Sequence, residues 1–201
     1  MEKKLSSRLL HEGKNFDFLV DDVELPNGHV TQRDIVRHPG AVAIVPILGD
    51  GRVALIRQFR YATGKTLLEI PAGTLEQGEP PLECAARELR EETGFEAKEL
   101  EPLLSYFMAP GYSDEVIHFF VARGLIVVGS DPEIDEEIAL EVRSLEEVRR
   151  MIEENIIEDA KTIVGILSLK GRVVGLQNSI VSRASSERRA ICFDHSLLFV
   201  Y

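Results

Sequence analysis

Alternating apolar and polar positions in the first third of the chain predict a series of short strands. Residues 1–39 alternate loosely around a turn at residues 26–28, which predicts a hairpin within a small N-terminal β unit. A stronger apolar pattern at residues 41–48 and 53–59, on either side of a glycine-rich turn, predicts a second hairpin. Residues 67–71 predict one further short strand before the periodicity changes.

The periodicity then becomes helical. Residues 81–93 lie between a double proline and Gly94, which predict where a helix begins and ends. Residues 145–157 and 159–169 are also amphipathic and predict two more helices. In the first helix, the apolar side chains expected to face the core are Leu82, Ala85, Ala86 and Leu89. Intervening strands are expected in a mixed or antiparallel sheet, at residues 103–107, 116–121 and 138–142.

Composition places the chain among globular proteins. Its 201 residues, 44% of them hydrophobic, suffice for one sizeable core. The longest apolar run, residues 41–48, is far shorter than the roughly 20 residues that span a bilayer, so no membrane helix is expected. The net charge of -11 has the wrong sign for binding a nucleic-acid backbone, so no nucleic-acid partner is expected. Cys84 and Cys192 are far apart and are expected to be buried thiols, and with no apolar leader the chain is expected in the cytoplasm.

Charge also suggests how the chain is divided. We expect an N-terminal β unit at residues 1–39, a main domain at 40–171 and a tail at 172–201. The tail holds four arginines and two acidic residues, so its charge is +2, whereas the remaining 19 basic and 32 acidic residues sum to -13. Its apolar side chains suit packing on the body or on a second subunit, and the sequence leaves both open.

The helix at residues 81–93 carries the candidate chemistry on its polar face. An i,i+4 spacing stacks Glu88 near Glu92 and Arg87 near Glu91. Stacked carboxylates repel one another, and oxygen ligands of this kind suit hard divalent cations such as Mg²⁺ or Mn²⁺. Gly73, just after a strand, would let a backbone carbonyl approach the same cation. Taken alone, the charges would equally describe a solvated helix face with Arg–Glu pairs.

The spacing of fixed residues across this segment is more specific than the charges. Residues 73–95 match the pattern G-x5-E-x7-R-E-U-x-E-E-x-G-U, in which U is a bulky apolar residue. The chain therefore resembles the Nudix hydrolases, which cleave nucleoside diphosphates linked to another group through metal-activated water. The resemblance implies a Nudix-type α/β/α sandwich around a mixed β-sheet. The matching positions are Gly73, Glu79, Arg87, Glu88, Leu89, Glu91, Glu92, Gly94 and Phe95.

The resemblance also implies residue roles. Glu88 and Glu92 would be the principal ligands of Mg²⁺ or Mn²⁺, with Glu91 assisting and the Ala72 carbonyl completing the shell. Glu91 and Arg87 would thereby belong to the catalytic set, since Arg87 can orient Glu91.

Residues around the motif are similar to one branch, the ADP-ribose pyrophosphatases. The similarity runs from about residue 13 to residue 170, with marks at residues 57–61, 69–73, 159–162 and Pro110. It implies hydrolysis of ADP-ribose to AMP and ribose 5-phosphate. Two alternatives stay open: hydrolysis of another nucleoside diphosphate derivative such as GDP-mannose, and a regulator that binds ADP-ribose without turnover.

In this branch a glutamate on the loop before the last strand acts as a general base or an extra metal ligand. The chain offers Glu136 as first choice, because it directly precedes the predicted strand at residues 138–142. Glu133 is the second choice and Glu137 the third. An ordinary solvated loop acid is the alternative for each of them.

Substrate contacts are inferred in the same way. A diphosphate in an acidic protein needs cations, so Arg60 is the first candidate for a phosphate contact and Arg33 the second. Phe16 is a candidate to stack an adenine, although packing in a core is the favoured role. Gly73 and Pro110 are assigned to the substrate side by the resemblance, which also implies a homodimer with exchanged N-terminal strands.

Overall fold

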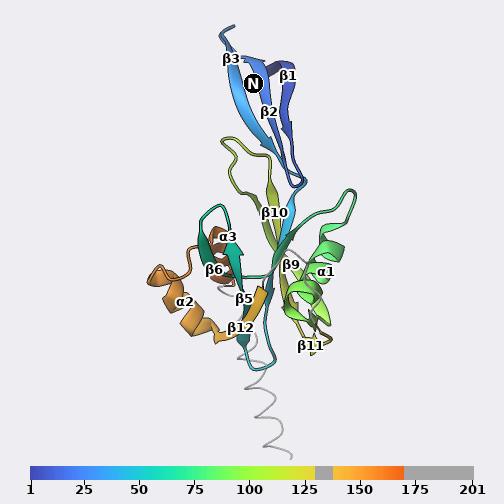
Figure 1. The fold of residues 1–201 in the computed structure, drawn as a ribbon, viewed down its shortest axis with the longest axis vertical. Helices are drawn as coiled ribbons and strands as arrows, with labels where there is room; N and C mark the ends of the chain where they lie inside the picture. The colour runs from blue at the N-terminus through green and yellow to red at the C-terminus, as the bar shows by residue number, and fades with distance from the viewer. Residues whose placement is uncertain (130–137, 170–201) are drawn as a thin grey trace, which may run out of the picture. The chain divides into compact units, whose positions relative to one another are not determined.

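The computed structural model describes residues 1–129 and 138–169 of the chain. The elements named below lie in the described ranges (Figure 1). None of the helices in these ranges is both long and apolar enough to span a bilayer.

An antiparallel sheet of order β1-β2-β3 forms the N-terminal part, from β1 (Lys3–Glu12), β2 (Asp17–Glu24) and β3 (Val30–Arg37). The hairpin predicted around residues 26–28 is confirmed as β2–β3, and Gly28 turns it with a φ of 81°. The strand β1 was not predicted, because it is largely polar and exposed along its whole length. Near its end, β3 bridges to Ser113 through Val36.

The central sheet has the order β7-β4-β10-β9, from β7 (Ala72–Thr74), β4 (Ala41–Pro46), β10 (Val116–Arg123) and β9 (Glu99–Phe107). β4 and β10 run parallel and the other pairs are antiparallel, which confirms a mixed sheet. Every residue of β4 is buried, as expected for a strand that is covered on both faces.

A second sheet has the order β12-β5-β6, from β12 (Ile138–Ser144), β5 (Arg52–Arg60) and β6 (Lys65–Glu69). The hairpin predicted between β4 and β5 is therefore wrong, although Ile47 and Val53 form one bridge beside the turn. Both edges of β4 are occupied by β7 and β10, so β5 pairs elsewhere. The short strands β8 (Phe95–Glu96) and β11 (Ile126–Val127) pair with each other.

Three helices in the described ranges complete the fold: α1 (Pro81–Thr93), α2 (Leu145–Glu153) and α3 (Ala160–Leu167). The predicted bounds of α1 are confirmed, and Gly94 ends it with a φ of 72°. α1 packs over Val42 and Ile44, whereas α3 lies against Val45 on the opposite face of the central sheet (Figure 1). This is the predicted α/β/α arrangement.

The core-facing side of α1 is narrower than predicted. Ala85 and Leu89 are buried, as expected, but Leu82 and Ala86 are exposed. The reason is that α1 packs on the sheet through Cys84, Ala85 and Leu89. The buried side of the helix is therefore centred away from Leu82 and Ala86.

Gly165 marks a close approach between α3 and the central sheet. A Cβ at this position would lie 2.9 Å from Cδ1 of Ile70 and 3.2 Å from Cγ2 of Val45. We expect Gly165→Val to lower the free energy of unfolding by about 1–3 kcal/mol, because the added methyl groups overfill a packed core. Urea denaturation measures the change. Gly49→Val is the control, since a Cβ at Gly49 meets nothing within 4 Å; equal losses in both variants would contradict close packing at α3.

Candidate functional site

Arg87 lies at the centre of the polar face of α1. Its Nε and Nη2 donate to the two carboxylate oxygens of Glu79 at 3.0 and 3.1 Å. Its Nη1 donates to Glu88 at 2.7 Å and to Glu91 at 3.0 Å. The hydrogen bonds from Arg87 lower the pKa of Glu79 to about 2, and the contact with Glu79 raises the pKa of Arg87. One guanidinium thus fixes the positions of three carboxylates.

Two acidic side chains of α1, those of Glu88 and Glu92, lie against the backbone of strand β7. The amide N–H of Ala72 donates to Oε2 of Glu92 at 2.8 Å, and the Glu92 side chain is buried. A Cβ on Gly73 would lie 1.9 Å from Oε1 of Glu88, so only glycine leaves room for this carboxylate. Glu88 and Glu92 therefore lie against consecutive residues of one short strand.

Arg60 ends β5 and has a buried partner. Its Nε and Nη2 donate to Glu69 at 2.9 and 2.6 Å, in a two-pronged ion pair. Glu69 is the main cause of the raised pKa of Arg60, and Glu92 also contributes, so the guanidinium lies within electrostatic reach of Glu92. The arginine side chain is 37% exposed.

Sequence reasoning missed the role of Glu69, which is buried at the end of β6. Its carboxylate accepts hydrogen bonds from both Arg60 and Lys161 on α3. Burial alone would raise the pKa of Glu69, but the hydrogen bonds and charges of Arg60 and Lys161 outweigh it and leave the pKa below its usual value. The signal in the sequence was an acid in an otherwise apolar run together with the 159–162 segment.

Comparison with known proteins places this geometry in a family. A model of the NUDIX domain matches residues 37–163, which include β7 and α1. The chain belongs to the Nudix family. It is 42% identical to the ADP-ribose pyrophosphatase of Bacillus subtilis (strain 168) over 171 residues, which cover 84% of this chain and 92% of the relative.

Two further similarities support the assignment to the Nudix family. The chain is 41% identical to the methanol dehydrogenase activator of Bacillus methanolicus, over 84% of this chain and 92% of that protein. A solved crystal structure of an ADP compounds hydrolase superimposes with a TM-score of 0.77 at 25% identity and covers 87% of this chain and 95% of its own. The Nudix fold and the status of the chain as a Nudix pyrophosphohydrolase follow from these matches.

Nudix hydrolases generally use divalent metals, and the donors on α1 fit such an ion. In residues 1–129 and 138–169, no three acidic, histidine or cysteine side chains converge closely enough to form a ready-made metal site. Glu88 and Glu92 nevertheless present hard oxygen donors beside the same two backbone residues, and Gly73 keeps the Glu88 carboxylate close to β7. Arg87 balances part of the negative charge of Glu88 and Glu91.

The N-terminal candidates lie in the β1-β2-β3 sheet. Arg33 in β3 forms an ion pair with Glu2 at 2.7 Å, and this contact raises its pKa. Phe16 precedes β2 and is 47% exposed, so the expectation that it packs in a core is wrong for the described chain. The buried residues of β2 are Val20, Asp21 and Val23 instead.

Pro110 belongs to the loop between β9 and β10. The loop is a compact turn, because the amides of Tyr112 and Ser113 both donate to the Ala109 carbonyl, and Val36 in β3 donates to the Tyr112 carbonyl at 2.8 Å. The candidate bases Glu133, Glu136 and Glu137 lie outside the described residues.

Cys84 is a buried thiol, as predicted. Burial raises its pKa to about 12, so the side chain is protonated at neutral pH and is not a nucleophile. Its Sγ contacts the Thr74 carbonyl at 3.6 Å and Nη2 of Arg87 at 3.3 Å. Cys192 lies outside the described residues.

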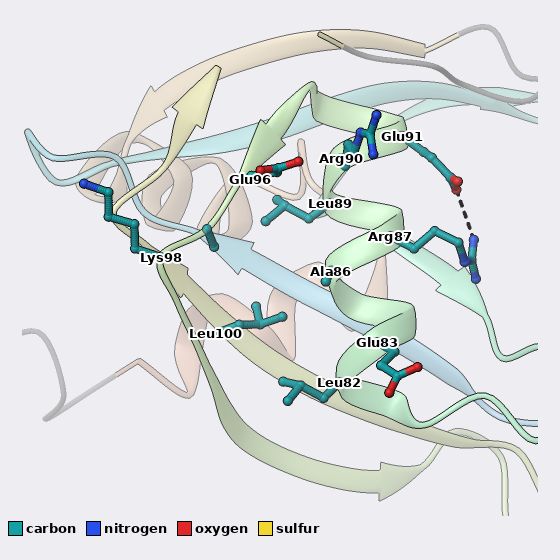
Figure 2. A pocket seen from close by; sticks show the side chains of 11 residues that line it. Leu82, Glu83, Ala86, Arg87, Leu89, Arg90, Glu91, Glu96, Lys98 and Leu100 are labelled. Carbon is teal, nitrogen blue, oxygen red and sulfur yellow. Dashed lines mark hydrogen bonds and ion pairs between the residues drawn. The ribbon is translucent and has the colours of Figure 1, made fainter. Parts of the chain in front are cut away.

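A cleft of ≈ 780 Å³ lies between α1 and the segment that includes β8 and the start of β9. Figure 2 shows Leu82, Leu89 and Leu100 on one side of α1 and the Arg87–Glu91 pair on the other. The cleft therefore adjoins the polar face of α1 only at its margin and does not contain Glu88 or Glu92 among its lining residues.

Proposed function

We propose that this Nudix enzyme hydrolyses the diphosphate bond of nucleoside diphosphate sugars and that ADP-ribose is its preferred substrate, giving AMP and ribose 5-phosphate. The observation that carries the chemistry is the placement of Glu88 and Glu92 against Gly73 and Ala72. The substrate choice is supported by the 42% identity to an ADP-ribose pyrophosphatase.

Residues of α1 and β7 would bind the metal ion and orient its ligands. Glu88 and Glu92 would hold Mg²⁺ or Mn²⁺, with Glu91 and the Ala72 carbonyl completing the set. Such a cation, when bound, polarises phosphoryl oxygens and lowers the pKa of a coordinated water. Arg87 keeps Glu88 and Glu91 oriented through its two Nη1 hydrogen bonds.

The remaining assignments concern the base and the substrate. We assign the general base to Glu136, or failing that to Glu133, because both precede β12 closely in the sequence. Arg60 would contact a substrate phosphate through the exposed part of its side chain, a role supported by the electrostatic effect of Glu92 on it. Gly73 and Pro110 would line the substrate side.

A homodimer would complete the site. The fully exposed β1 and the half-exposed Phe16 are suited to contact with a second subunit, where Phe16 would stack the adenine and Arg33 would reach the phosphates. We place the enzyme in the cytoplasm, on the ground that its two cysteines are widely separated in sequence and Cys84 is a free, buried thiol.

A substrate panel tests the function. Purified protein with Mg²⁺ is offered ADP-ribose, GDP-mannose, dinucleotides and nucleoside triphosphates, and phosphate is read after phosphatase coupling. We expect the highest kcat/KM for ADP-ribose, with AMP as product, loss of turnover in EDTA and recovery with Mg²⁺ or Mn²⁺. A higher kcat/KM for GDP-mannose would keep the chemistry and overturn the substrate.

A second candidate is a regulator that binds ADP-ribose and acts on a partner protein. The 41% identity to a protein named as an enzyme activator favours it. Retention of Glu88, Glu91 and Glu92 favours hydrolysis, since a regulator has no need of three carboxylates suited to a metal on one helix. Binding of ADP-ribose with no turnover in the panel would select the regulator.

A further inference from the structure

Residues 69–73 form a segment that is held along its length by side-chain and backbone groups of other elements. At its start, the Glu69 carboxylate binds Lys161 of α3, and the Ile70 amide donates to Oγ1 of Thr162 at 2.8 Å. In the middle, the Pro71 carbonyl accepts the amide of Ile44 at 2.8 Å. A segment fixed at consecutive residues can transmit a displacement from one end to the other.

The far end of the same segment meets the metal-binding carboxylates proposed above. Ala72 donates its amide to Glu92, and Gly73 lies against the Glu88 carboxylate. Only Pro71 separates Ala72 from Ile70, so α3 and α1 contact neighbouring residues of one short stretch of backbone. Consecutive Cα atoms are held about 3.8 Å apart by the planar peptide, so a shift at Ile70 has little slack in which to dissipate before Ala72.

At the α3 end of the segment, the donor and the acceptor of each hydrogen bond can be assigned. The Thr162 hydroxyl donates to Oδ2 of Asp159 at 2.5 Å, which leaves its oxygen lone pairs to accept the Ile70 amide. Asp159 also accepts the Thr162 amide at 2.9 Å and lies 3.1 Å from Nζ of Lys161. Thr162 is fully buried and Lys161 is 9% exposed, so neither group has water as an easy substitute partner.

We propose that Lys161 and Thr162 are positioning residues for the metal site. By holding Glu69 and Ile70 they keep residues 69–73 where Ala72 binds Glu92 and Gly73 borders Glu88, and they touch neither metal nor substrate. The proposal rests on the proposed function for the identity of the metal ligands.

Two substitutions and a matched control test the proposal. Thr162→Val removes the hydroxyl and keeps the shape of the side chain, and Lys161→Met removes the charge and keeps most of the length. Ser144→Ala is the control, because Ser144 also bonds a backbone amide at a helix start, that of Glu147 at 3.1 Å, but belongs to α2. Thr162→Ser keeps the hydroxyl and is the rescue variant.

The main readout is Mn²⁺ binding without substrate, followed by the electron paramagnetic resonance of free Mn²⁺. We expect the dissociation constant to rise about tenfold in Thr162→Val and Lys161→Met, the size seen when groups that support metal ligands are removed. Thr162→Ser and Ser144→Ala should stay within about twofold of the wild type, since the support is kept or lies elsewhere. In activity assays, the Mg²⁺ concentration for half-maximal turnover should rise in parallel, while KM for ADP-ribose at saturating Mg²⁺ changes less.

Unchanged Mn²⁺ binding in both variants, with melting temperatures lowered as in Ser144→Ala, would overturn the proposal and leave a purely structural network. If either variant fails to fold, amide hydrogen exchange of the wild-type protein tests the proposal instead. The amides of Ile70 and Ala72 are then expected to open with the same free energy, and a much faster exchange of Ala72 would overturn the proposal. Wild-type protein that binds Mn²⁺ but turns over no substrate would refute the proposed function alone.

Discussion

Turnover of ADP-ribose is expected to fall by roughly 100-fold or more in Glu92→Gln, a loss of about 3 kcal/mol or more of transition-state stabilisation. Glutamine keeps an oxygen that can accept the Ala72 amide, which Glu92 now binds at 2.8 Å, so the fold and β7 should be retained. The substitution removes the negative charge of a buried side chain assigned to the metal. Initial rates over a range of Mg²⁺ concentrations measure the effect.

Glu83→Gln provides the control for this result. Glu83 lies in the first turn of α1, is exposed and is not among the proposed metal ligands, so the same chemical change there should leave turnover within about twofold. Far-ultraviolet circular dichroism shows whether both variants fold. Near-normal turnover in a folded Glu92→Gln protein would remove Glu92 from the metal ligands and contradict the site.

The parts of this fold that could be predicted from sequence are those set by local chemistry. The bounds of α1 follow from two prolines that suit a first helical turn and a glycine that suits the left-handed stop. The pairing of Arg87 with Glu91 follows from helical spacing alone. The sequence predicted that Gly73 lets a backbone carbonyl approach the cation bound by the α1 carboxylates, whereas the structure shows that this glycine leaves room for the Glu88 carboxylate itself.

The parts that could not be predicted depend on non-local pairing. The apolar runs of β4 and β5 flank a good turn, and a local pattern cannot show that β7 and β10 already occupy both edges of β4. The contact of Lys161 with Glu69 joins residues far apart in the chain, and an isolated lysine in a helix is usually a solvated side chain. Strand β1 has no apolar alternation to reveal it.

Gly73→Ala is expected to reduce turnover by roughly 100-fold while leaving most of the stability intact. The new methyl group would lie 1.9 Å from Oε1 and 2.5 Å from Oε2 of Glu88, so the flexible carboxylate must move away from β7. Because the group displaced is the end of a side chain and not backbone, the protein can accommodate the methyl at modest cost. Gly49→Ala, where a Cβ meets nothing within 4 Å, should keep full activity.

A double-mutant cycle with Glu88→Ala separates displacement of Glu88 from a general disturbance of β7. If the methyl group acts by moving the Glu88 carboxylate, Gly73→Ala has little left to disrupt in the Glu88→Ala protein, and the two losses in kcat should be far from additive. Additive losses would mean that the added methyl group disturbs another contact, such as the hydrogen bond from the Ala72 amide to Glu92. Strong coupling would tie the requirement for glycine at this position to a single carboxylate.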